Sequence, residues 1–402
     1  MIAQTTVSTS RPHQVLRIGA EAGSRVPVDA IWEGVEGLYG TGLYPAIGLC
    51  IRHRGQVILD RTVGHVDNPP GGVPGPMASP ETLFSLFSAS KILTAVLVHA
   101  LVEDGLFSLD DPVYRLLPGF ERHGKQGILV RHLLNHTAGI PSMPADLDVQ
   151  RVLDERRVDV ELIFDLRPEF EPGTKSAYHP CTSWFLLQEI CERRTGQPLR
   201  QLACERLLEP LGFEHMNYGV DPADLDRVAR HYRTGPPVAP VMRRIFERTI
   251  GCDLDLAVEM SNSELFLTET LPMANVCTTG REMTRFLQML LNGGELDGVR
   301  VLRRDTVRRA VAESTKVRLD GTFGFPMRYS LGMMMGGNRF SLFGLTTRGA
   351  FGHLGFSNVV VYGDPSRDLA VSFLNTGKPM LAPGMLRWQG ILQRIALSVP
   401  RR

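Results

Sequence analysis

The sequence lacks an excess of either charge and any apolar run long enough to cross a membrane. There are 44 lysines and arginines against 43 aspartates and glutamates, which gives a formal net charge of +1 at pH 7. The basic residues are scattered, whereas a nucleic-acid-binding domain gathers them on one face. The apolar run Ile92–Val102 is far shorter than the roughly 20 residues of a membrane-spanning helix. We therefore expect neither a nucleic acid nor a membrane as a partner, and the oligomeric state stays open.

Cysteine is scarce as well, and its spacing is irregular. The six cysteines are Cys50, Cys181, Cys191, Cys204, Cys252 and Cys277. No two of them stand at the short paired spacing of a thiolate metal site or a compact disulfide framework. We interpret them as mostly reduced core thiols, with one or two disulfides as the alternative. The first 27 residues also lack the continuous apolar core of a signal peptide, and both observations favour a cytoplasmic protein.

What remains is the composition of an ordinary globular protein. Of the 402 residues, 43% are hydrophobic and 22% are charged, which allows one large domain or two interleaved ones. Strand-like patterns lie near both ends and helical patterns in the middle. The simplest fold is one sheet built from both ends of the chain with a helical domain inserted. We expect residues 28–105 and 273–402 to form the sheet domain, 106–272 the helical domain, and 1–27 a disordered or extended lead-in.

Hydrophobic periodicity and turn residues predict the individual elements. Strands are predicted at 46–51 and 56–59, joined as a hairpin, and at 329–334, 356–362 and 369–375. Helices are predicted at 28–38, 131–141, 146–169, 181–195, 205–212, 279–291, 304–312 and 385–397. Residues 217–272 have the weakest periodicity, so we predict an irregular surface excursion over a cleft.

The residues with the clearest chemical pattern are Ser88-Ala89-Ser90-Lys91, an S-x-x-K sequence. If a helix begins near Ser88, positions i and i+3 share one face, so the Lys91 amine can lie beside the serine hydroxyl. A serine hydroxyl is a weak nucleophile until a base takes its proton. Burial can lower the pKa of a lysine enough to make it that base.

The sequence context strengthens this weak pattern, because S-x-x-K is common by chance. After Lys91 the chain is apolar nearly all round to Val102 and ends at Glu103-Asp104-Gly105, a polar end with a glycine stop. A helix that is apolar on all sides is buried. Its N-terminus therefore opens into the interior or a cleft, where free backbone N–H groups could stabilise an oxyanion.

Seven short blocks together resemble the serine β-lactamase-related hydrolases, which include class C β-lactamases, DD-peptidases and family VIII carboxylesterases. No single block is specific, but all seven stand in the family's order over roughly residues 45–375. They are Phe84–Lys91, Leu109–Pro112, Arg131–Gly139, Pro172–Tyr178, Glu209–Gly212, Phe286–Gly294 and Gly352–Gly355. The resemblance implies an α+β fold, with a mainly antiparallel sheet flanked by helices, an inserted all-helical domain, and the active site between them.

The resemblance also implies roles for single residues. Ser88 resembles the acylated nucleophile and Lys91 its partner on the helix. Tyr178 resembles the tyrosine that shares proton transfer with the lysine, and which of the two takes the serine proton stays open. His353-Leu354-Gly355 resembles the third motif, on a strand that lines the site. The backbone N–H of Phe356 is then expected to face that of Ser88 as the second oxyanion donor.

Two departures from the family pattern bear on the substrate. The second motif is commonly Tyr-x-Asn, but here it is Tyr178-His179-Pro180, and a proline cannot hold an acylamino side chain as an amide can. His179 is expected either to line the cleft or to lie at the surface. The third motif has Leu354 where a hydroxyl is usual and His353 where a lysine is often found. A histidine in an ordinary environment is mostly neutral at pH 7, so both changes weaken the binding of a substrate carboxylate.

Three functions remain open at this point. An esterase that cleaves uncharged esters is favoured, and an acyltransferase that passes the acyl group to an alcohol or amine is the first alternative. A β-lactamase or penicillin-binding protein is the second. No cofactor is expected, and no metal, because His132 and His136 share a helix face without the glutamate or third ligand of a zinc site. We interpret those two histidines as capping or packing residues.

Overall fold

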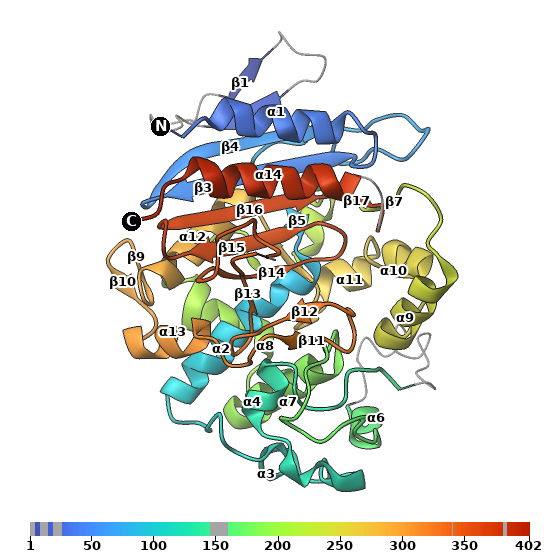
Figure 1. Cartoon of the computed structure of the whole chain (residues 1–402), viewed down its shortest axis with the longest axis vertical. Coiled ribbons are helices and arrows are strands. Elements are labelled where there is room, and N and C mark those ends of the chain that lie inside the picture. Colours follow the sequence, from blue (N-terminus) through green and yellow to red (C-terminus); the bar gives the residue numbers. More distant parts are fainter. Residues whose placement is uncertain (1–4, 9–14, 19–25, 145–159, 340, 381–383) are drawn as a thin grey trace.

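A mainly antiparallel sheet with helices on both faces forms the centre of the molecule (Figure 1). The computed structural model describes residues 5–8, 15–18, 26–144, 160–339, 341–380 and 384–402. All neighbours in the eight-stranded sheet are antiparallel, and the strands are, in spatial order, β1 (Thr5–Ser8), β2 (Val15–Ile18), β4 (Gln56–Gly64), β3 (Ala46–His53), β16 (Leu369–Asn375), β15 (Val360–Asp364), β14 (Phe351–Leu354) and β13 (Met334–Met335). The sheet thus takes strands from both ends of the chain, as expected.

Smaller pairings connect the sheet to the rest of the chain. One three-stranded sheet contains β5 (Phe84–Ser85), β8 (Val276–Thr278) and β6 (Asn217–Tyr218), and the parallel pair consists of β17 (Gly377–Lys378) and β7 (Tyr232–Arg233). The described residues also form two short hairpins, β9 (Glu295–Leu296) with β10 (Val299–Arg300) and β11 (Arg318–Leu319) with β12 (Pro326–Met327). The β5 pairing matters most here, because β5 leads directly into Ser88.

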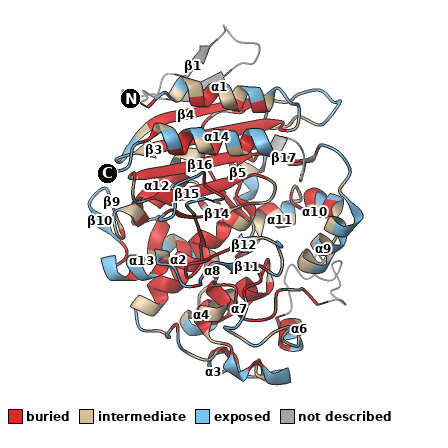
Figure 2. Cartoon of the chain, viewed as in Figure 1, coloured by how far each residue is buried: buried red, intermediate tan, exposed pale blue. Residues whose placement is uncertain are grey.

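Alternate residues of the sheet face two separate cores, as the period of two in a strand requires. In β16, Val371 and Phe373 belong to a core with α1 (Val28–Tyr39) and α14 (Gly384–Ser398), whereas Ala370 and Leu374 belong to the other core. That second core contains α2 (Lys91–Glu103) and α12 (Gly280–Leu291). Figure 2 shows α2 buried along most of its length, in agreement with its all-round apolar sequence.

The remaining helices pack mainly below the sheet, in the half of Figure 1 that contains α3, α4 and α7. They are α3 (Val113–Leu116), α4 (Val130–Leu134), α6 (Glu161–Phe164), α7 (Thr182–Thr195), α8 (Leu199–Ala203), α9 (Pro240–Ile250), α10 (Leu254–Met260), α11 (Glu264–Thr268) and α13 (Arg304–Val311). Short 3-10 helices occupy η1 (Phe87–Ser90), η2 (Arg122–Gly127) and η4 (Pro222–Arg227), and η3 (Cys204–Leu208) is a π-helical turn.

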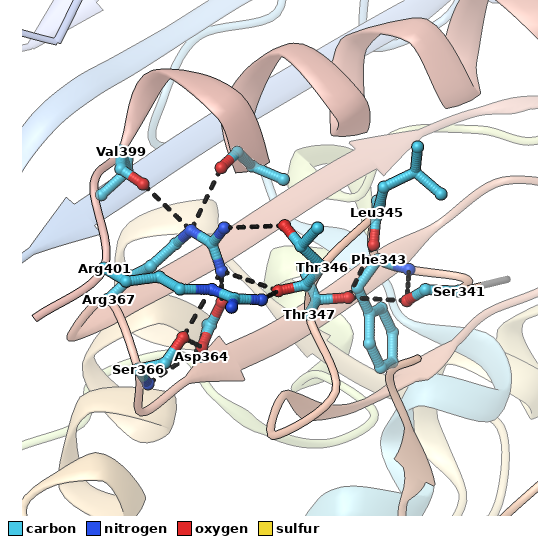
Figure 3. Close-up of polar contacts among 12 residues, drawn as sticks. Ser341, Phe343, Leu345, Thr346, Thr347, Asp364, Ser366, Arg367, Val399 and Arg401 are labelled. Carbon is cyan, nitrogen blue, oxygen red and sulfur yellow. Dashed lines mark hydrogen bonds and ion pairs between the residues drawn. The ribbon is translucent and has the colours of Figure 1, made fainter. Parts of the chain in front are cut away.

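A buried arginine fixes the C-terminal helix against the sheet. The Arg367 guanidinium pairs with the Asp364 carboxylate at 2.7 Å and donates to the carbonyl oxygens of Ala396 and Val399 at 3.1 and 3.0 Å. It also donates to the side chain of Thr346, in the loop before β14 (Figure 3). Because Arg367 and Asp364 are almost fully buried, removal of either would leave an uncompensated charge.

Most long elements lie where the sequence predicts them, and the errors lie in short ones. The structure confirms the hairpin at 46–59 and the helices near 28–38, 181–195, 279–291, 304–312 and 385–397. Of the helix predicted at 131–141, α4 covers only the start, and of the helix predicted at 205–212, η3 covers only a part. The strand predicted at 329–334 is wrong, because β13 begins only at Met334. The strand predicted at 356–362 corresponds to β15, which begins at Val360. Of the helix predicted at 146–169, residues 146–159 lie outside the described residues and only Glu161–Phe164 is helical.

The prediction of irregular structure at 217–272 is also wrong, since α9, α10 and α11 lie there. Two of these helices begin at an ordinary side-chain N-cap. The Asp253 side chain accepts a hydrogen bond from the Leu256 N–H, and Ser263 does the same for Phe266. With seven residues in α10 and five in α11, these helices are too short for a clear hydrophobic period, so the capping residues mark them better than the periodicity does.

The cysteine prediction is confirmed in part. All six thiols are free, but only Cys50, Cys191 and Cys277 are buried, and the other three are half-buried. In the described part of the chain, no helix is both long and apolar enough to cross a membrane.

Candidate active site

Ser88 lies in the short turn that joins β5 to the buried helix α2. The residue before it, Phe87, has φ 47°, a left-handed conformation that is strained for a bulky side chain. Ser88 is half-buried, and its hydroxyl oxygen lies 3.0 Å from the Lys91 Nζ, with which it hydrogen-bonds. The S-x-x-K spacing therefore brings the two groups together as predicted.

Lys91 is fully buried, and its surroundings favour the neutral amine. Its Nζ also donates to the Met273 carbonyl at 3.3 Å and lies 5.2 and 5.5 Å from the ring centroids of Tyr178 and Trp184. No ion pair with a carboxylate joins Lys91 in the described residues. Burial lowers the pKa of Lys91 to about 7. Near neutral pH a large fraction of the amine is therefore unprotonated, with a lone pair that can accept the serine proton.

The neighbouring Ser90 has a different environment. It is fully buried, and its hydroxyl accepts a hydrogen bond from the Val276 N–H at 2.9 Å, in β8. Ser90 thus holds η1 against the small sheet, and only Ser88 of the two lies beside the Lys91 amine.

A loop from a distant part of the chain holds Tyr178 near the lysine. The Tyr178 N–H donates to the Asp320 carboxylate at 3.1 Å, the Thr322 hydroxyl donates to the Tyr178 carbonyl at 2.8 Å, and the Phe323 ring stacks on Tyr178 with centroids 4.8 Å apart. Burial raises the pKa of Tyr178 far above its usual value, and the nearby Ser88 side chain offsets only part of this rise. The tyrosine hydroxyl is therefore protonated here, and among the described residues it completes no hydrogen bond.

His353 lies on β14, where its ring centroid is 5.8 Å from that of Tyr178. It is fully buried, and burial, helped by the Lys91 charge, lowers the pKa of His353 to about 3. Its Nδ1 lies 2.6 Å from the Leu354 carbonyl oxygen. The imidazole is therefore neutral at any ordinary pH and provides no positive charge for a substrate carboxylate.

Gly355 brings the end of the third motif against the nucleophile turn. A Cβ at this position would lie 2.3 Å from the Leu86 carbonyl oxygen, so only glycine permits the approach. The next residue, Phe356, has its ring centroid 5.4 Å from that of Phe87. The backbone segments that contain Ser88 and Phe356 are thus close neighbours, as two oxyanion donors must be.

His179 does not fit its predicted place among the substrate-binding residues. Its Nε2 accepts a hydrogen bond from the Ile140 N–H at 3.0 Å, and its Nδ1 lies 2.6 Å from the Ala177 carbonyl oxygen. Burial lowers the pKa of His179 to about 4, so the ring is neutral. Because both ring nitrogens bond to the backbone, neither is available to a substrate, and His179 supports the loop instead.

The two other histidines pack as expected. The His136 ring lies between Tyr178 and Tyr329, with centroids 4.8 and 4.7 Å away, and its Nδ1 accepts from the His179 N–H at 3.1 Å. The His132 Nδ1 accepts from the Leu129 N–H at the start of α4. Within the described ranges, no group of three or more His, Cys, Asp or Glu side chains could hold a metal ion.

The sequence reasoning missed Asp320, which organises the loop that holds Tyr178. This buried carboxylate accepts hydrogen bonds from the backbone N–H groups of Tyr178, Thr322 and Phe323 and from the Tyr329 hydroxyl at 2.7 Å. Asp320-Gly321-Thr322 is readable as a turn. Nothing in the sequence indicates that the turn reaches the second motif.

Comparison with known proteins adds independent findings. A sequence model described as Beta-lactamase matches residues 34–394. The chain is 29% identical over 337 residues to the esterase/beta-lactamase LipL of Mycobacterium tuberculosis, covering 80% of this chain and 74% of LipL.

Two solved structures have a similar fold. A penicillin-binding protein homologue from Caulobacter crescentus is 25% identical, with a TM-score of 0.78, and the match covers 95% of this chain and all of that one. A family VIII carboxylesterase is 22% identical, with a TM-score of 0.79, over 94% and 99% of the two chains. The second likeness concerns the fold alone.

Proposed function

Since the chain belongs to the beta-lactamase family of serine hydrolases, we propose that it is an esterase that cleaves uncharged carboxylic esters through an acyl-enzyme on Ser88. One observation carries the proposal: a buried amine with a pKa of about 7 lies 3.0 Å from a half-buried serine hydroxyl. Such an arrangement activates a nucleophile without a metal or a histidine base.

In the proposed mechanism, neutral Lys91 takes the Ser88 proton as the serine oxygen attacks the ester carbonyl. The developing oxyanion accepts hydrogen bonds from the backbone N–H groups of Ser88 and Phe356. The Tyr178 hydroxyl, protonated and near Ser88, gives its proton to the leaving alkoxide and regains one from Lys91. Water then attacks the acyl-enzyme by the same route in reverse.

The neutral character of the third motif supports an uncharged substrate. A β-lactam has a carboxylate that must be bound, and His353 is buried and neutral while Leu354 has no side-chain donor. Pro180 cannot replace the amide that would hold an acylamino group. An ester requires only the nucleophile, its base and two backbone donors. The name of the relative LipL includes both esterase and beta-lactamase, so the two activities need a direct comparison.

We expect kcat/KM for p-nitrophenyl acetate and butyrate to exceed that for nitrocefin on the same preparation. Each missing charged hydrogen bond is worth about 1.5–3 kcal/mol, so two could lower acylation by an anionic substrate about 10²- to 10⁴-fold. Ser88→Ala provides the background rate for all three substrates. A nitrocefin value equal to the ester values would favour a β-lactamase, with the exposed Arg348 as the first candidate for the carboxylate partner.

Addition of millimolar alcohol or amine to the ester assay tests the fate of the acyl group. We expect the free acid to remain the main product, because a hydrolase passes its acyl group to water. A new ester or amide as the main product would replace the esterase with an acyltransferase on the same catalytic residues. Product analysis by mass spectrometry distinguishes the two outcomes in one experiment.

We also propose that the enzyme is cytoplasmic, which its six unpaired cysteines support. Among the described residues, 106–272 contain helices α3, α4 and α6 to α11, which is consistent with the proposed helical domain, although β6 and β7 also lie there.

A further inference from the structure

A second lysine is buried behind the nucleophile turn. Lys378, on β17, has no exposed surface. Its Nζ donates to the Phe356 carbonyl at 3.1 Å and to the Asn375 carbonyl at 3.3 Å. No carboxylate pairs with it in the described part of the chain. Burial of an amine without a counter-ion destabilises a fold, so its position calls for an explanation.

The same amine contacts Phe356, which carries one proposed oxyanion donor, and Phe87, which directly precedes the other. Its Nζ lies 4.5 Å from the ring centroid of Phe87 and 5.8 Å from that of Phe356. Phe87 directly precedes Ser88 and has the strained φ of 47°. The His231 ring contacts Phe87 edge-on at 4.6 Å, next to β7, the partner strand of β17. The Lys378 amine therefore lies against two residues that adjoin or carry the proposed oxyanion donors.

We propose that Lys378 is a positioning residue that holds the backbone around Ser88 and Phe356 so that their N–H groups converge on the oxyanion. This inference rests on the proposed function. The Lys378 amine holds the peptide that directly follows Phe356, through the Phe356 carbonyl oxygen, and restrains Phe87 through its ring. A strained residue persists only where its surroundings hold it. An oxyanion hole contributes most when its donors are fixed before the reaction.

The chain provides a matched control in Lys125. It too is fully buried, and its Nζ donates to the carbonyl oxygens of Arg122, Phe164 and Leu166 at 2.6 to 2.7 Å and lies 5.2 Å from the Phe120 ring centroid. Lys125 thus has the same chemistry, carbonyl acceptors and an aromatic face, but it lies on η2 and its partners belong to segments other than the Ser88 turn.

The test compares Lys378→Met with Lys125→Met in three measurements. These are the melting temperature, kcat and KM for p-nitrophenyl butyrate, and the affinity for an alkylboronic acid. Both variants should melt at a lower temperature. Only Lys378→Met should lower kcat, by about 10- to 100-fold, less than the roughly 10²- to 10³-fold that follows loss of an oxyanion donor itself. KM should change little, and boronate affinity should fall in parallel with kcat, because the boronate adduct places an oxygen in the oxyanion hole.

Equal kcat losses in the two lysine variants, or a kcat for Lys378→Met within about twofold of wild type, would overturn the positioning role. If Lys378→Met does not fold, Lys378→Gln replaces it. The glutamine side chain keeps one donor group, but it is too short to reach the carbonyl oxygens of both Phe356 and Asn375. Unchanged kcat and boronate affinity in this variant would again contradict the proposal. Wild-type protein that hydrolyses no ester and takes up no fluorophosphonate on Ser88 would instead refute the proposed function.

Discussion

Replacement of Ser88 by alanine should lower kcat/KM for p-nitrophenyl butyrate by about 10⁴-fold or more, because the acyl-enzyme can no longer form. The residual rate should come only from binding and the backbone donors. The melting temperature checks that the variant folds, and it should change little, because Ser88 is half-buried and its hydroxyl bonds to side chains of the site rather than to the core.

Ser90 is the internal control for this result. Ser90→Ala removes the hydroxyl that accepts a hydrogen bond from the Val276 N–H, so the variant should have a lower free energy of unfolding. Its Ser88 should still be acylated as in the wild-type protein. A fluorophosphonate probe followed by peptide mapping locates the adduct directly. An adduct on Ser90, or anywhere outside residues 84–91, would refute the assignment of Ser88.

Lys91 and Tyr178 should behave as one unit with Ser88. Lys91→Ala and Tyr178→Phe should each lower kcat/KM nearly as far as Ser88→Ala, and the double variant should be little worse, because groups that act together are not additive. One result would contradict the assignment of Tyr178. If Tyr178→Phe keeps most of the activity while Lys91→Ala is inactive, the leaving-group proton comes from elsewhere and the tyrosine is a packing residue.

The pH dependence follows from the same pair. Burial lowers the pKa of Lys91 to about 7, and the unprotonated amine is the active form. Activity should therefore be low in acid and rise with pH through an apparent pKa near 7 that belongs to the coupled groups. His353, with its pKa lowered to about 3, and His179, lowered to about 4, do not titrate in that range. A rate that falls between pH 6 and 8 would rule out a lysine base.

The sequence predicts the part of the site that depends on local spacing. Ser88 and Lys91 are three residues apart on one turn, so their contact requires only that the turn be helical. The need for a glycine at the end of the third motif appears only in the fold, where a Cβ at Gly355 would lie 2.3 Å from the Leu86 carbonyl oxygen.

The sequence alone did not predict the contacts between segments that are far apart in the chain. His179 follows the second-motif tyrosine directly, which suggested a substrate contact, yet the fold encloses it between Ala177 and Ile140. Asp320 stands in an ordinary turn sequence, and nothing in the sequence marks Lys378 as a buried residue. Their roles depend on burial and on partners in other elements, Tyr178 for the first and Phe356 for the second.

The pairing of β3 with β16 has a consequence for how the molecule is made. These neighbours in the sheet join residues 46–53 to residues 369–375, so the sheet cannot close until nearly the whole chain has left the ribosome. Until then β3 and β4 form a hairpin with one edge unpaired and an apolar face uncovered, which invites association with other chains. Contacts between such distant segments also slow folding, because the loop must be closed before they form. The parts of β14 and β17 that adjoin Ser88 arrive in this last step, so an incomplete chain would contain the nucleophile without the structure that makes it reactive.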